Sequence, residues 1–139
     1  MKTQQDIAVF LLRITLASGF LSATASRLGL WGAQSSGWRD FVSYTAETNS
    51  FFPQSSAPAI AIGSTAAEIL IGFLLLVGCQ VRKTAFCASV LTLLFAVAMS
   101  ISFGLKEPLD YSVFVFSTGA YLLSTFPDYK WTLEKFLNQ

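Results

Sequence analysis

Four apolar segments constrain this chain more than any other feature of its sequence. A helix needs about 20 mainly apolar residues to cross the hydrocarbon core of a bilayer. The segments 7–28, 59–78, 84–103 and 111–126 approach that length, and the last is short but rich in aromatic residues. Because backbone groups find no water in lipid, each segment should be a helix with its hydrogen bonds closed internally. The sequence predicts an all-α integral membrane protein, a four-helix bundle.

The composition supports one membrane unit. Apolar residues make up 53% of the 139 residues and charged residues only 12%, with a mean hydropathy of +0.57. These values are unusual for a soluble domain. We therefore expect a single transmembrane domain over 1–139 that ends in a tail over 127–139. A net charge of +1 gives no attraction for nucleic acid.

The distribution of basic residues predicts the orientation. Basic residues resist translocation, so the side that holds more of them near the span ends is cytoplasmic. Five lie on the side of the termini (Lys2, Arg82, Lys83, Lys130 and Lys135) and three on the other (Arg27, Arg39 and Lys106). We expect both termini in the cytoplasm and a multi-pass protein of the bacterial inner membrane. A cleaved signal peptide is the alternative for the first span, but Arg13 interrupts its apolar region.

The long connection 29–58 should contain a short helix. In "GWRDFVSYTAETNSFFP", Trp38 and Phe41 share one helical side with Val42 and Thr45, and the other side is polar. This pattern is typical of a helix at a membrane interface. Two roles stay open for Trp38 and Phe41: simple anchoring in the interface, or a lid over an outward-facing cavity.

Small and polar residues predict which helix faces meet. Membrane helices pack through small side chains and through hydroxyls that bond across the interface. Stripes of this kind recur every four residues in the first three spans: Ser18, Ser22 and Ser26; Ser64, Glu68 and Gly72; Thr92, Ala96 and Ser100. We expect these stripes to face inward. Before the fourth span, Asp110 is expected to cap the helix.

The chain offers few residues for metal or covalent chemistry. It has no histidine, and its two cysteines, Cys79 and Cys87, are separated by seven residues around the basic turn without a CxxC motif. A metal site is not expected. The cysteines are interpreted as small residues at helix ends, with a redox role as the alternative. Because no catalytic motif is present, the sequence favours a non-enzyme.

Two charged residues inside the predicted spans need an explanation. Arg13 lies in the first span and Glu68 in the second, and a charge at the bilayer centre costs at least about 2.5–3.5 kcal/mol. They could form an ion pair that joins the two spans. Alternatively, Arg13 reaches the inner headgroups and Glu68 faces a cavity whose wall includes Arg27, Ser64 and Tyr111. In that case Glu68 is a candidate proton or quinol partner.

Four stretches carry a family resemblance: "LLRITLASGFLSATASRLGLWG", "AAEILIGFLLLVG", "QVRKTAF" and "GLKEPLDYSVF". With them, nearly the whole chain resembles the DoxX family of small bacterial four-helix membrane proteins. The resemblance implies this fold and a link to membrane redox systems, which include a thiosulfate and quinone oxidoreductase and an assembly with a sulfurtransferase and superoxide dismutase.

We therefore expect a DoxX-like accessory subunit of a membrane redox or oxidative-stress complex. A quinone is the candidate ligand, and the lipid bilayer, other subunits of the complex and a second copy of the chain are the candidate partners. Two alternatives are a quinone-dependent oxidoreductase and a pathway for protons or small solutes.

Overall fold

The computed structural model describes residues 2–139, and within this range the chain is helical without strands. Its elements are α1 (Lys2–Arg27), η1 (Gly32–Gln34), α2 (Trp38–Thr48), η2 (Gln54–Ser56), α3 (Ala57–Val77), α4 (Val81–Phe103), α5 (Lys106–Asp110), α6 (Val113–Ser124) and α7 (Leu133–Leu137). The predicted all-α fold class is thus confirmed.

Three helices, α1, α3 and α4, are long and apolar enough to cross a membrane. They match the first three predicted spans to within a few residues, apart from an earlier start of α1. The fourth predicted span is shorter than expected. Its 12-residue helix α6 is about 18 Å long at 1.5 Å per residue. The chain cannot extend α6 backwards as one helix, because Ser112 has a left-handed φ of 56°.

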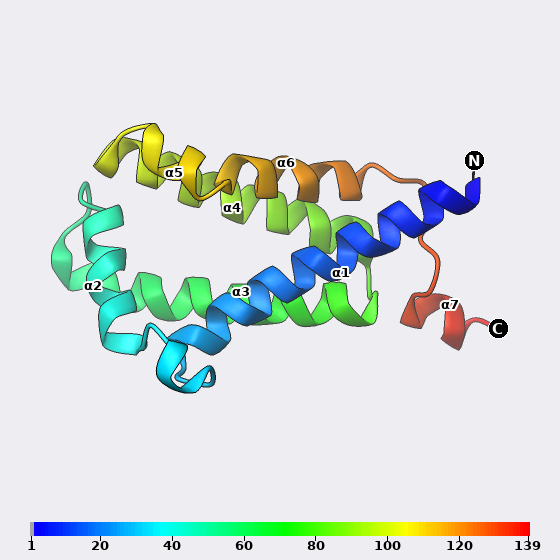
Figure 1. Ribbon diagram of the computed structural model, residues 1–139, viewed down its shortest axis with the longest axis horizontal. Coiled ribbons are helices and arrows are strands. Elements are labelled where there is room, and N and C mark those ends of the chain that lie inside the picture. The colour runs from blue at the N-terminus through cyan, green and yellow to red at the C-terminus, as the bar shows by residue number, and fades with distance from the viewer. Residues whose placement is uncertain (1) are drawn as a thin grey trace.

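The helices run back and forth along one long axis (Figure 1), with both termini at the same end and α2 and α5 at the other. Helix α1 packs mainly on α3, and α4 mainly on α6. The two pairs lie farther apart toward α2 (Figure 1). The cytoplasmic location of the termini stays a prediction.

Small residues let neighbouring helices approach closely, although only part of the predicted pattern of small residues is observed. A Cβ on Gly72 would lie 2.9 Å from Leu21 of α1, and one on Gly19 would lie 2.8 Å from Phe116 of α6. Between α4 and α6, the Ser117 hydroxyl donates to the Ser89 carbonyl at 2.9 Å. Close approach of these helices therefore depends on glycine and serine at single points.

The predicted serine stripe on α1 is wrong. Ser18 and Ser22 are exposed, whereas the buried face of α1 consists of Val9, Arg13, Leu16, Ala17, Phe20 and Thr24. Phe20 and Leu21 of α1 lie against Gly72 of α3 instead, where the absence of a side chain leaves them room. On α3 and α4 the predicted stripes do face inward, with Glu68, Gly72, Thr92 and Ala96 buried.

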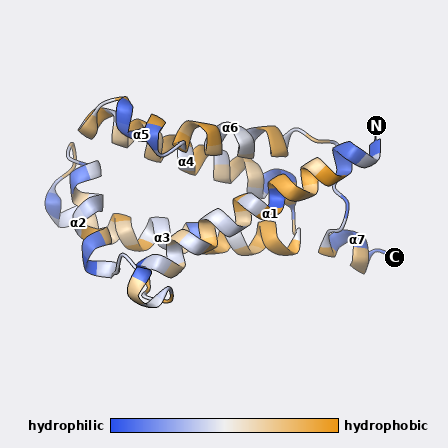
Figure 2. Cartoon of the chain, viewed as in Figure 1, coloured by the Kyte–Doolittle hydropathy of each residue, from blue (hydrophilic) through white to orange (hydrophobic). Residues whose placement is uncertain are grey.

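The outer surface of the long helices is apolar. Large side chains such as Phe73, Leu94 and Val115 are 57%, 60% and 70% exposed. Figure 2 shows hydrophobic residues along the helix shafts and hydrophilic residues gathered toward the two ends. A surface of this kind suits hydrocarbon as the surrounding solvent.

The predicted cap of the fourth span falls on a different residue. Asp110 is the last residue of α5 and pairs with Lys106, while Ser112 occupies the N-cap position of α6. Asp110 ends the short helix α5, and the left-handed Ser112 separates that helix from α6. Asp110 therefore lies two residues before the N-cap position of α6.

Candidate functional site

The buried charge of α3 is paired with the last residue of α1. Nη1 of Arg27 lies 2.9 Å from Oε2 of Glu68, and the two side chains are only 13% and 3% exposed. The same nitrogen donates to Thr65 Oγ1 at 3.2 Å. Thr65 precedes Glu68 by three residues, so both project from one face of α3.

The rest of the guanidinium is covered by an aromatic ring. Cζ of Arg27 lies 3.8 Å from the centroid of the Phe41 ring of α2, which is a cation–π contact. The carboxylate is less completely satisfied, because Oε1 of Glu68 is buried and no donor from residues 2–139 reaches it. One carboxylate oxygen is therefore in an ion pair and the other is available as an acceptor.

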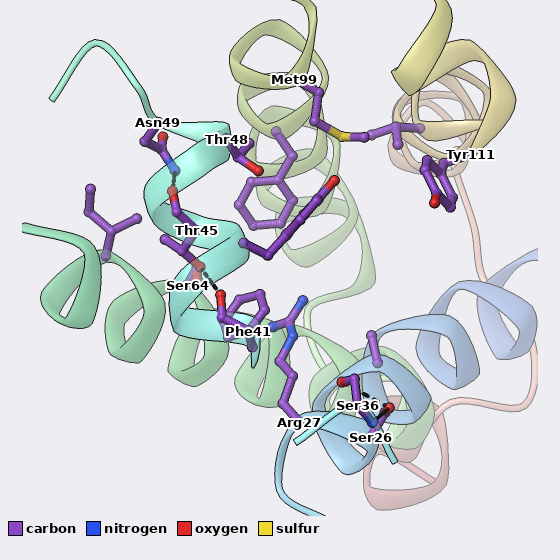
Figure 3. Close-up of a pocket in the computed structure, with 15 residues that line it drawn as sticks. Ser26, Arg27, Ser36, Phe41, Thr45, Thr48, Asn49, Ser64, Met99 and Tyr111 are labelled. Atoms are coloured by element: carbon purple, nitrogen blue, oxygen red, sulfur yellow. Dashed lines mark hydrogen bonds between the residues drawn. The ribbon is translucent and has the colours of Figure 1, made fainter. Parts of the chain in front are cut away.

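Arg27 also lines a cavity of about 580 Å³ beneath α2, at the end of the bundle opposite the termini. Figure 3 shows Arg27 extending into this space toward Phe41, with Tyr111 and Met99 across from it. A volume of this size is in the range of small-molecule sites, about 300–1,000 Å³. Its lining residues are Ala23, Ser26, Arg27, Ser36, Phe41, Tyr44, Thr45, Thr48, Asn49, Ile60, Ser64, Phe95, Met99, Tyr111 and Val113.

Glu68 itself lines a second cavity of about 210 Å³ that adjoins the first. The two share Ala23, Arg27, Phe95, Tyr111 and Val113, and the smaller one is completed by Gly19, Phe20, Glu68, Thr92 and Phe116. Most of these side chains are apolar. The site thus combines apolar walls with one buried ion pair, the usual composition of a ligand pocket.

Helix α2 covers the larger cavity. Phe41, Tyr44, Thr45, Thr48 and Asn49 all face it, whereas Trp38 packs on Phe41 with ring centroids 5.9 Å apart. Burial raises the pKa of the Tyr44 phenol above its ordinary value, so this side chain is a neutral hydroxyl at pH 7. The position of Phe41 supports the lid hypothesis, which stays a proposal.

Arg13 does not join this site. Its Nη2 donates to the Trp131 carbonyl at 2.8 Å, and its guanidinium lies 5.3 Å from the Phe10 ring. Both contacts are at the end of the molecule that holds the termini. The proposed Arg13–Glu68 pair is therefore wrong. Side chains on antiparallel helices lean toward opposite ends, and this directs Arg13 away from Glu68.

The structure brings four of the five predicted site residues together. Glu68, Arg27 and Tyr111 line the smaller cavity, and Ser64 lines the larger one. Sequence reasoning missed Thr65, Phe95 and Met99. The signal for Thr65 was its spacing of three from Glu68, but Phe95 and Met99 differ in no visible way from the lipid-facing residues around them.

Other groups lie apart from this site. Cys79 is partly exposed, Cys87 is exposed, and both are free thiols. Across residues 2–139, no group of three or more histidine, cysteine, aspartate or glutamate side chains is placed to hold a metal ion.

A sequence comparison matches residues 5–110 to the family model "Methylamine utilisation protein MauE". The match covers α1 to α5 and contains Arg27, Ser64 and Glu68, while Tyr111 lies just beyond it. No curated protein and no solved structure matches the chain. The expected membership of the DoxX family is confirmed only in part. The matched family also consists of small multi-pass membrane proteins, but it is not DoxX.

Proposed function

The chain belongs to the MauE family of methylamine utilisation proteins, and we propose that it is an accessory membrane protein of a redox system that serves methylamine utilisation. Oxidation of an amine such as methylamine releases electrons, and these electrons need an acceptor. The resemblance to DoxX proteins, which are linked to membrane redox systems, supports the same setting. We place the protein in the bacterial inner membrane, with other subunits of this system as its partners.

We further propose that the cavity beneath α2 binds a small, mostly apolar molecule, with a quinone headgroup as the example. The observation that carries this proposal is the buried Arg27–Glu68 pair at 2.9 Å: Arg27 lines the cavity of about 580 Å³, and Glu68 lines the adjoining cavity of about 210 Å³. Burying two charges is unfavourable unless their geometry is good, and a purely structural bundle has no need of them. Ionisable groups inside a membrane protein are a functional hypothesis by default.

A growth experiment tests this role. Deletion of the gene in its host should slow growth on methylamine and leave growth on ammonium unchanged. Wild-type protein should restore growth, and Ile60→Trp, which fills the cavity from α3, should not. Ile62→Trp is the matched control, because Ile62 is two residues away and 60% exposed on the lipid side. Undiminished growth of the deletion strain on methylamine contradicts the role, and equal rescue by both variants contradicts the use of the cavity.

A further inference from the structure

We infer that the cavity selects a neutral, mostly apolar molecule that carries a hydrogen-bond donor, a hydroxyl or an N–H, and that Oε1 of Glu68 accepts this bond. For a quinone-type ligand this means that the reduced, hydroxyl-bearing form binds in preference to the quinone. The inference rests on the proposed use of the cavity and specifies its ligand.

The first step is the unequal state of the two carboxylate oxygens. Oε2 of Glu68 is paired with Arg27 at 2.9 Å, whereas Oε1 has no donor among the described side chains and backbone groups. Glu68 is only 2% exposed, so bulk water does not supply that donor freely. A buried acceptor left open is costly, and a ligand that satisfies it gains affinity on the order of tenfold. The missing partner is therefore a donor.

The second step concerns charge. Arg27 and Glu68 together are neutral, so neither sign of ligand charge gains a net attraction. A cation near Oε1 would be repelled by the guanidinium bonded to the same carboxylate. An anion would find Nη1 of Arg27 already engaged with Glu68 and Thr65, and Phe41 across the face of its guanidinium. Since a charged ligand must also lose its hydration here, a neutral one is favoured.

The third step concerns size and shape. The smaller cavity, which Glu68 lines, has about 210 Å³, compared with about 150 Å³ for an engineered apolar cavity that binds benzene. It can hold one six-membered ring with small substituents. Phe20, Phe95, Val113 and Phe116 supply apolar and aromatic walls for such a ring. The larger adjoining cavity has room for a side chain of the ligand.

The oxidation state of a quinone-type ligand follows from this geometry. A quinone carbonyl can only accept a hydrogen bond, so it would place one acceptor against another, Oε1 of Glu68. Each hydroxyl of a hydroquinone can donate to Oε1. A lipid-like alcohol has the same donor, and the two sources must be separated by experiment.

The test is calorimetric titration of the purified protein in detergent under anaerobic conditions. The probes are trimethylhydroquinone, trimethylbenzoquinone and the dimethyl ether of the hydroquinone, which has the same ring without a donor. We expect the hydroquinone to bind about tenfold or more tightly than the other two. In Glu68→Gln, whose amide both donates and accepts, the preference for hydroquinone over quinone should fall below about threefold. Ile62→Ala, on the lipid side of the same helix, should keep it.

Each outcome has one meaning. Equal affinity of the wild-type protein for all three probes overturns the donor inference and leaves the proposed cavity in place, and this comparison stands even if Glu68→Gln fails to fold. Absence of binding by every probe overturns the proposed ligand site as well. Cyclohexanemethanol and its methyl ether identify the source: a preference for this alcohol as large as that for the hydroquinone supports the donor rule and assigns a lipid-like ligand.

Discussion

Arg27 and Glu68 are the two residues on which the site depends. Each is tolerable in a low-dielectric interior because the other neutralises it at 2.9 Å. Removing one partner of a buried pair leaves an uncompensated charge, and this typically costs about 3–5 kcal/mol, whereas replacing both by apolar residues is often neutral. The pair should therefore behave as a unit.

We expect Arg27→Met to lower the free energy of unfolding by about 3–5 kcal/mol. The double variant Arg27→Met with Glu68→Leu should recover most of this loss. Unfolding of the detergent-solubilised protein by SDS titration compares Arg27→Met, the single variant Glu68→Leu and the double variant. If the double variant loses as much free energy of unfolding as the two single variants together, the two side chains do not interact.

Gly78, just after the end of α3, is another residue at which the structure does not tolerate a larger side chain. It has a left-handed φ of 76°, and a Cβ there would lie 2.6 Å from Nη1 of Arg13 and 2.9 Å from Cα of Thr132. Gly78→Ala should therefore destabilise the protein by at least about 1–2 kcal/mol, the left-handed penalty alone. Gly63→Ala is the control, because apart from its chain neighbours and the backbone of its own helix no described atom lies within 4 Å of that Cβ. It should be neutral or stabilising by up to about 1 kcal/mol.

At the scale of elements, α2 packs on α3 and on the end of α4 beside the cavity. The Ser102 hydroxyl donates to the Thr48 carbonyl at 2.5 Å and lies 2.8 Å from the Ser50 hydroxyl. The Tyr44 and Phe103 rings stack with centroids 5.8 Å apart. Both of these hydrogen bonds to α4 involve Ser102, so loss of this side chain should loosen α2 locally without unfolding the bundle.

Ser102→Ala should therefore increase hydrogen exchange in 38–48 by about 5- to 10-fold, which corresponds to one lost hydrogen bond. Exchange in α3 and α4 should not change. Ser100→Ala is the matched control, because the Ser100 hydroxyl donates to the Ala96 carbonyl within α4. Equal exchange of α2 in both variants would show that Ser102 does not hold the cover.

The tail after α6 is the second element with a defined attachment. Arg13 bonds the Trp131 carbonyl, Arg82 donates to the Phe126 carbonyl at 2.9 Å, and Lys130 pairs with Asp6 at 3.2 Å on the surface. Of these, the buried bond from Arg13 should matter most, because exposed ion pairs contribute little.

We expect Arg13→Met to accelerate proteolysis within 127–137 by about tenfold, as the loss of a bond from a charged donor implies. The bundle should stay as stable or become more so, since two further nitrogens of Arg13, Nε and Nη1, find no acceptor in the described chain. Lys130→Met should leave the tail protected. A tail cut equally fast in wild type and Arg13→Met contradicts this attachment.

At the scale of the whole molecule, the sequence predicted the elements better than their contacts. Apolar length identified α1, α3 and α4, because a bilayer imposes that length on any spanning helix. The break at Ser112 was not visible, since a left-handed serine has no sequence signature. The partner of Glu68 was also missed. Arg13 and Arg27 lie on the same helix, and the sequence does not show which of them lies level with Glu68. The position of α1 along α3 brings Arg27 to Glu68.

The cavity could be predicted only in outline. Arg27, Ser64, Glu68 and Tyr111 were identified because polar groups in an apolar span need a reason. Its apolar walls were not identified, because Phe95 on the cavity side and Leu94 on the lipid side have the same hydrophobic character. Helix rotation decides between them, and rotation depends on packing against neighbours.

Cysteine accessibility tests the central claim, that α3 presents one face to a cavity open opposite the termini and the other to lipid. Ser64→Cys lines the cavity and Ile62→Cys faces lipid; both are made with Cys79 and Cys87 replaced by alanine. In intact cells, a small membrane-impermeant methanethiosulfonate reagent should modify the cysteine at position 64 and spare the one at position 62. Modification only at position 62, or equal modification of both, would contradict the account.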